Sequence, residues 1–84
     1  MKCPLCNEEL DVYDVDRAFY GHIDKYADCN HCHHTFIFII RYNKLFKYHV
    51  WDLYFDEKDK QWYSKEDSMK TKYLIEPKEL MKKK

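Results

Sequence analysis

The sequence predicts a mostly β protein: a small antiparallel sheet with a metal site at one end and a short helix at the C-terminus. Residues 35–40 are β-branched or aromatic at every position, which is typical of a buried strand. Residues 45–55 form a second stretch rich in aromatic and aliphatic side chains. Two CxxC pairs, one beginning at Cys3 and one at Cys29, precede both stretches. These features favour a sheet that a metal ion holds at one end.

The chain is short enough for one domain, and we expect residues 1–84 to form it. A chain of this length leaves only a thin core, because small domains bury a smaller share of their surface. It therefore needs a metal, disulfides or a partner to stay folded. Within the domain we expect metal-binding turns in residues 1–40, additional hairpin strands in 41–75, and a short helix or a frayed basic tail in 76–84.

The N-terminal half predicts three strands. Residues 10–15 mix β-formers with Asp, which is typical of a half-exposed strand. Asp and Arg residues within 14–17 suggest a turn, and residues 19–27 then return towards the second Cys pair, with Gly21 as a bend or bulge. Residues 35–40 are expected at the centre of the sheet, buried on both faces.

The C-terminal half predicts further hairpin strands. A turn follows the central strand, and Asn43 can adopt the positive φ that such turns need. Neither face of residues 45–55 is uniformly apolar, so we expect a bend or bulge to separate two short strands there. The remaining segments are a charged loop at 56–60, a hairpin strand at 61–64, a last strand at 72–75 and a short helix that begins near Pro77.

The two CxxC pairs have 22 residues between them, a separation typical of zinc sites. Two thiolates three positions apart can reach one ion if the backbone between them makes a tight turn, and two such turns supply a tetrahedron of sulfur atoms. Each turn needs a residue that tolerates positive φ directly after its second Cys, where Asn7 and His33 stand. The predicted ligands of one structural Zn²⁺ are Cys3, Cys6, Cys29 and Cys32.

The motifs around these cysteines resemble the two knuckles of a zinc ribbon. The first is CPLC-N-x-x-L from Cys3, and the second is Y-x-x-C-N-H-C-x-x-x-F from Tyr26. The resemblance covers residues 1–40, although the Gly that usually follows each pair is missing. It implies a small β ribbon around one zinc ion, and it implies no particular partner, because zinc ribbons serve many kinds of protein.

Three other arrangements would use the same cysteines. Two disulfides are disfavoured because no secretory signal opens the chain. A thioredoxin-like redox pair is disfavoured because Cys3 leaves no room for the strand that precedes such a motif. Iron in the same four-sulfur cage stays open, because tetrahedral sulfur accepts both ions.

Three histidines, His31, His33 and His34, surround the second Cys pair. Four cysteines already complete a tetrahedral site, so we expect these histidines to be exposed neighbours and not ligands. Such a site also lacks the open position that a catalytic zinc keeps for water. We therefore expect no enzyme, and the sequence contains no GxSxG, HExxH or P-loop motif.

Fifteen basic and fifteen acidic side chains give a net charge of zero, which argues against a protein that coats nucleic acid. The charge alternates along the chain: −4 over 1–28, +3 over 29–50, −3 over 51–69 and +4 over 70–84. We expect opposite charges to meet across neighbouring strands. No apolar run is long enough to cross a membrane and no signal peptide is evident, so we expect a cytoplasmic protein.

The chain holds more aromatic side chains than so small a core can bury, so several must lie at the surface. We expect a non-enzymatic, zinc-stabilised module that binds another protein, because Tyr and Trp are enriched at interaction hot spots. The predicted contact residues are Trp51, Tyr54, Trp62 and Tyr63. This profile suits a small phage-encoded regulator or inhibitor of a host protein. The composition, rich in Lys, Tyr, Ile and Asp and poor in Gly, Ala and Arg, is typical of an AT-rich genome.

An alternative is a nucleic-acid-binding zinc ribbon that acts in transcription or replication. Residues 29–50 hold no acidic side chain, and aromatic rings in that stretch can stack on bases. The predicted contacts are Arg41, Tyr42, Lys44, Lys47 and Tyr48. No sequence feature predicts a small-molecule substrate.

Overall fold

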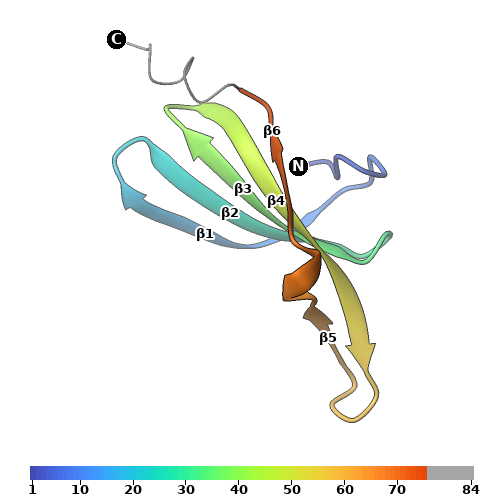
Figure 1. Ribbon diagram of the computed structural model, residues 1–84. Coiled ribbons are helices and arrows are strands. Elements are labelled where there is room, and N and C mark those ends of the chain that lie inside the picture. Colours follow the sequence, from blue (N-terminus) through green and yellow to red (C-terminus); the bar gives the residue numbers. More distant parts are fainter. Residues whose placement is uncertain (76–84) are drawn as a thin grey trace.

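The computed structural model describes residues 1–75, which form one antiparallel sheet (Figure 1). Strands β1 to β4 follow each other in order across the sheet, and β5 and β6 both pair with β4. The elements are β1 (Asp11–Phe19), β2 (His22–Cys29), β3 (His34–Arg41), β4 (Lys44–Asp56), β5 (Gln61–Ser64), the 3₁₀ turn η1 (Glu66–Ser68) and β6 (Lys70–Tyr73). The prediction of a mostly β, antiparallel fold is confirmed. The helix or tail expected at 76–84 lies outside the described residues.

The first hairpin turns at Tyr20 and Gly21, so the turn predicted within residues 14–17 is wrong. Gly21 supplies the turn with a left-handed φ of 76°. β1 therefore continues through the Asp-rich stretch to Phe19, with two irregularities in its pairing with β2. An edge strand tolerates these charges because one of its edges faces water, where charge also deters aggregation.

The centre of the sheet is β3, flanked by β2 and β4. Phe36 and Phe38 point to one face of the sheet and Thr35 and Ile39 to the other, because successive side chains of a strand alternate. All four are buried. The predicted central strand with burial on both faces is confirmed.

Tyr42 and Asn43 form the turn between β3 and β4, and both have positive φ (53° and 67°). Two consecutive left-handed residues fit the twist of a tight hairpin. The positive φ predicted for Asn43 is confirmed. The backbone N–H of Tyr42 donates to the carbonyl of Gly21 at 2.7 Å, so the turn between β3 and β4 is tied to the turn of the first hairpin.

β4 is a single strand of 13 residues, where two short strands were expected over 45–55. The expected irregularity is present as a bulge at Phe46, because its neighbours Leu45 and Lys47 pair with consecutive residues of β3. The faces of β4 are mixed because its two halves have different partners. The first half lies in the main sheet, whereas the last residues pair with β5 in a hairpin that extends beyond it (Figure 1).

The last strand, β6, begins two residues before the predicted 72–75 and ends at Tyr73. The chain leaves β6 at the bulge of β4, where the backbone N–H groups of Leu74 and Ile75 both donate to the Phe46 carbonyl, at 2.8 and 3.1 Å. In the part of the chain described here, no helix has the length and apolarity needed to cross a bilayer.

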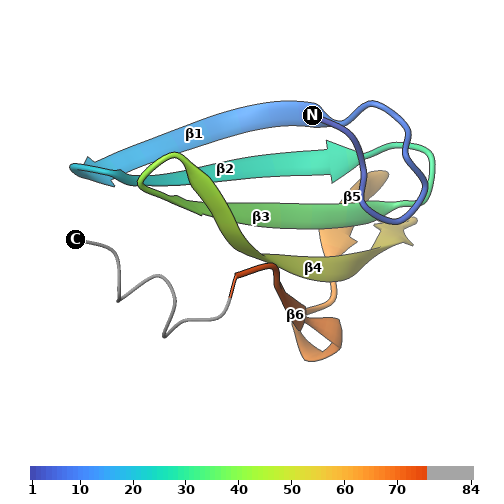
Figure 2. The same cartoon turned by 90° about the horizontal axis from the view of Figure 1, so that it is seen from above.

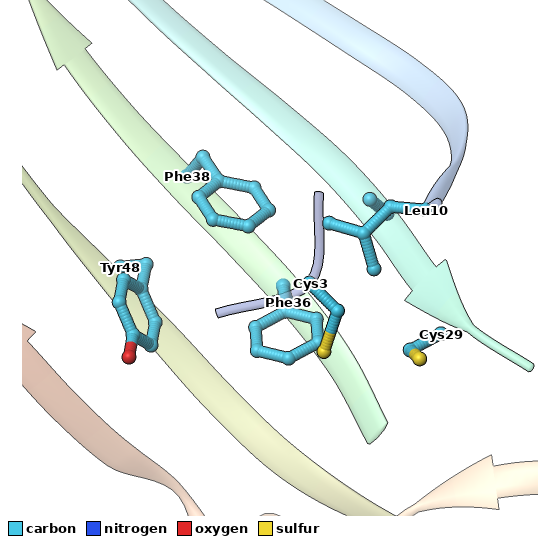
Figure 3. Close-up of a cluster of buried hydrophobic side chains, with 7 residues drawn as sticks. Cys3, Leu10, Cys29, Phe36, Phe38 and Tyr48 are labelled. Carbon is cyan, nitrogen blue, oxygen red and sulfur yellow. The ribbon is translucent and has the colours of Figure 1, made fainter. Parts of the chain in front are cut away.

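The core lies on one face of the sheet, where side chains of the N-terminal segment meet those of the strands (Figure 3). Figure 2 shows this segment at the end of the sheet where β2 ends and β3 begins. In this segment the N–H of Cys3 donates to the Glu8 carbonyl at 2.7 Å, and the N–H of Leu10 donates to the Met1 carbonyl at 2.8 Å. Cys3 and Leu10 are thereby directed onto the buried side chains Ala27, Cys29, Phe36, Phe38 and Tyr48. The N-terminal segment thus covers part of the thin core, although it contains no long strand.

Gly21→Ala is expected to destabilise the fold. A Cβ at this position would lie 2.7 Å from the Tyr42 ring, and the left-handed backbone itself disfavours a side chain. We expect the backbone conformation alone to cost about 1–2 kcal/mol of unfolding free energy, measured by chemical denaturation of the metal-loaded protein.

A double-mutant cycle with Tyr42→Ala separates the steric contact from the backbone strain. In the Tyr42→Ala background, Gly21→Ala should cost less, because the ring that it meets is gone. An equal cost in both backgrounds would contradict the contact.

Candidate metal centre

Three parts of the chain bring the four cysteines together. Cys3 and Cys6 lie in the N-terminal turn before β1, Cys29 is the last residue of β2, and Cys32 lies in the turn into β3. Cys3 and Cys29 are fully buried and belong to the core, whereas Cys6 and Cys32 are half-buried at its edge. The site therefore continues directly from the hydrophobic core (Figure 3).

The sulfur atoms are spaced for one ion. All four Sγ atoms lie within 4.8 Å of one another. The Cys6–Cys29 pair is separated by 3.4 Å and the Cys3–Cys32 pair by 3.7 Å. A tetrahedral ion with metal–sulfur bonds of about 2.3 Å requires sulfur–sulfur distances of about 3.8 Å. The predicted convergence of the four cysteines is confirmed at metal-binding distance.

Both CxxC turns have the backbone geometry that the sequence predicts. Asn7 and His33 adopt left-handed φ values of 66° and 59°. Each closes its turn by donating its backbone N–H to the carbonyl of the first Cys, Asn7 to Cys3 at 2.8 Å and His33 to Cys29 at 3.0 Å. The N–H of Leu5 also points at the Cys3 sulfur, 3.4 Å away, where it stabilises negative charge.

The thiols differ in how readily they ionise. Burial raises the pKa of Cys29, but hydrogen bonds from the N–H groups of Cys32 and His31 and from two neighbouring thiols outweigh it and bring the pKa to about 7. Burial and hydrogen bonds with the other thiols raise the pKa of Cys32. A backbone hydrogen bond from Glu8 favours the Cys6 thiolate, yet burial and the adjacent thiols raise its pKa overall. Only a cation would allow all four to ionise together.

The three nearby histidines lie outside the cysteine cluster, and two of them have other contacts. The His33 ring stacks on Trp62, with ring centroids 4.5 Å apart and planes within 7°. Nε2 of His34 lies 2.7 Å from the Asp52 carboxylate, and His31 is exposed. Within residues 1–75, the cluster at metal-binding distance consists of the four cysteines.

This donor set fits an ion that prefers sulfur and tetrahedral geometry. Four thiolates complete its coordination, so the ion would have no open position for a substrate. It would instead tie the N-terminal segment to the end of β2 and the turn into β3. Zinc coordination contributes on the order of 10 kcal/mol in small zinc-finger peptides, which exceeds what a core of this size supplies.

On the opposite face of the sheet lies an open groove of about 690 Å³. Three of the four residues predicted to contact a partner line it: Trp51, Trp62 and Tyr63. Trp62 is 48% exposed. Tyr54 does not line the groove; its ring lies 6.1 Å from that of Tyr63, beside a second, smaller hollow.

The five residues predicted to contact nucleic acid are not all available at the surface. Tyr48 is buried in the core. Arg41 donates to a carboxylate of β2 at 3.2 Å, and the Lys47 ammonium lies over two aromatic rings, at 5.4 and 5.1 Å. Tyr42 and Lys44 remain exposed at the turn between β3 and β4.

The sequence analysis missed the other walls of the groove. They come from Tyr13, Tyr26 and Asp28 on β1 and β2, and from Glu66 and Met69 after β5. Tyr13, Tyr26 and Asp28 are distant from the tryptophans in sequence, and the register of the sheet brings them to the same face. Because side chains alternate along a strand, the sequence already placed Tyr26 and Asp28 on the same face of β2. It did not show which face of β2 points to the core.

Comparisons with protein-family models, curated proteins and solved structures find no match to this chain. The assignment of a possible metal site therefore depends on the geometry of the cysteines. The description of the groove depends on the residues that line it.

Cys29→Ser is expected to abolish metal binding and to unfold at least residues 1–40. It removes one of four donors from a site that fixes the cover of the core. A strong chelator should unfold the same region of the unmodified chain. Metal analysis after reducing purification measures binding, NMR measures folding, and a visible absorption band distinguishes iron from zinc.

His31→Ala is the matched control, because His31 is exposed beside Cys32 and lies outside the cluster. It should keep one metal ion per chain and an unchanged melting temperature. Native stability of metal-free Cys29→Ser would contradict a structural metal.

Proposed function

We propose that the protein is a non-enzymatic, zinc-stabilised module that acts by binding another protein. The observation that carries this proposal is the groove in which Trp51, Trp62 and Tyr63 come together on the face opposite the metal centre. Large aromatic side chains that are partly exposed in a concave surface are the usual anchors of protein interfaces. The arrangement suits a binding surface that is ready before its partner arrives.

The metal centre supports this role by fixing the groove. The turn that holds Cys32 also holds His33, whose ring stacks on Trp62. The carbonyl of His33 accepts a hydrogen bond from the N–H of Leu53, a groove residue, at 2.9 Å. An ion at the cysteines would therefore restrain one wall of the groove as well as the core.

Zinc is the metal that we propose, as the ion of a zinc-ribbon-type site in a reducing cytoplasm. Four thiolates around it leave no position for catalysis, which supports a module without enzymatic activity. Iron would occupy the same cage, and metal analysis separates the two. Such a module suits a small phage-encoded regulator or inhibitor of a host protein, and the composition is typical of an AT-rich genome.

Nucleic-acid binding in transcription or replication remains the alternative. It now depends mainly on Tyr42 and Lys44, because Tyr48 is buried and Arg41 is paired with Asp24. Binding of single-stranded DNA or RNA that weakens with salt would favour it.

Trp51→Ala and Trp62→Ala are each expected to remove the captured partner. The tagged, metal-loaded protein is incubated with a lysate of the organism that carries the gene, or of its host, and the bound proteins are identified. Truncation of a hot-spot Trp should lower capture by about tenfold or more.

Tyr20→Ala is the matched control, because Tyr20 is 95% exposed at the far end of the first hairpin, outside the groove. It should capture the same proteins as the unmodified chain. If both Trp variants keep their metal and still capture every partner, the groove is not the binding surface.

A further inference from the structure

We infer that the groove accepts a basic segment of the partner protein, with Lys or Arg side chains lying on its aromatic walls. This inference rests on the proposed function, and it adds the charge of the partner. It follows from three features of the groove: the sign of its charged side chains, the acidic side chains around it, and the chemistry of its walls.

The charged side chains that line the groove are both acidic. Asp28 stands on β2, next but one to Tyr26, and Glu66 begins η1. Asp28 is half-buried, and within residues 1–75 neither carboxylate forms an ion pair with a Lys or Arg side chain. Two unpaired carboxylates beside a partly buried surface favour a cationic ligand and disfavour an anionic one.

The acidic character extends along the same face of the first hairpin. Asp14 and Asp16 pair across the strands with Tyr26 and Asp24, so their side chains share the face of the groove. Burial raises the pKa of the Tyr26 hydroxyl, and the charges of Asp24, Asp16 and Asp14 raise it further. Arg41 pairs with Asp24 at 3.2 Å, whereas within residues 1–75 neither Asp14 nor Asp16 forms an ion pair.

The walls are suited to long cationic side chains. Trp51, Trp62, Tyr13 and Tyr26 present aromatic rings, on whose faces ammonium and guanidinium groups bind. Ile37 and Leu53 add aliphatic surface for the methylene stems of Lys and Arg. A phosphate backbone would meet the same carboxylates with like charge, so the groove favours a basic polypeptide over a nucleic acid.

Binding of defined peptides tests this inference. Three labelled peptides of equal length are titrated into the metal-loaded protein: one rich in Lys and Arg, one with Gln at those positions and one with Glu. We expect the basic peptide to bind about tenfold more tightly than the Gln peptide and to weaken with salt. The Glu peptide should not bind.

The double variant Asp28→Asn and Glu66→Gln should reduce the preference for the basic peptide to about threefold or less, because two rim charges are worth only modest energy each. Glu8→Gln with Glu57→Gln is the matched control. Both are exposed carboxylates outside the groove, and the change in net charge is the same. The control should keep the full preference.

The outcomes separate this inference from the proposed function. Equal binding of all three peptides, lost in Trp51→Ala, would overturn the preference for a cation and leave the groove as a binding site. A loss of preference in the Glu8 and Glu57 control as well would assign it to overall charge and overturn the role of Asp28 and Glu66. If none of the three peptides binds while capture from lysate still depends on Trp51, the inference of a basic partner segment is overturned. The proposed function is then retained.

Discussion

Four sulfur atoms meet where the N-terminal segment, the end of β2 and the turn into β3 come together, and the rest of the fold depends on this junction. The sheet has one apolar face that needs cover, and residues 1–10 provide it with little regular hydrogen bonding of their own. Bonds from the cysteines to a metal ion would hold this segment in place of the backbone hydrogen bonds that a regular strand would form. Cys3 and Cys29 belong to both the core and the cysteine cluster, so binding of a metal ion there would be coupled to folding.

Because side chains alternate along each strand, the two faces of the sheet carry different features. One face holds the core and the cysteines, whereas the other holds the open groove. The two faces are nevertheless linked through His33, which directly follows the last cysteine and stacks on Trp62. The turn that holds Cys32 is therefore in direct contact with the groove.

The zero net charge conceals a separation of charge that the fold partly neutralises. Arg41 on β3 meets Asp24 on β2, as expected for opposite charges on neighbouring strands. Other carboxylates on the same face have no such cation within residues 1–75, and they lie around aromatic side chains. These carboxylates and the aromatic rings beside them give the groove its acidic and aromatic surface, which the net charge of the chain does not reveal.

The sequence by itself determined the four cysteines that gather at metal-binding distance, the left-handed residues after each Cys pair, the central strand and three of the five aromatic residues that line the groove, because each depends on local spacing or on a short run of residue types. It misplaced the first turn, since Asp within a strand resembles Asp in a turn until Gly21 is seen to close the hairpin. Only the tertiary structure decided that β4 is continuous, that Tyr48 is buried, and that Asp28 and Glu66 share a groove with Trp51. Those features depend on strand register, which is set by contacts between residues far apart in the chain.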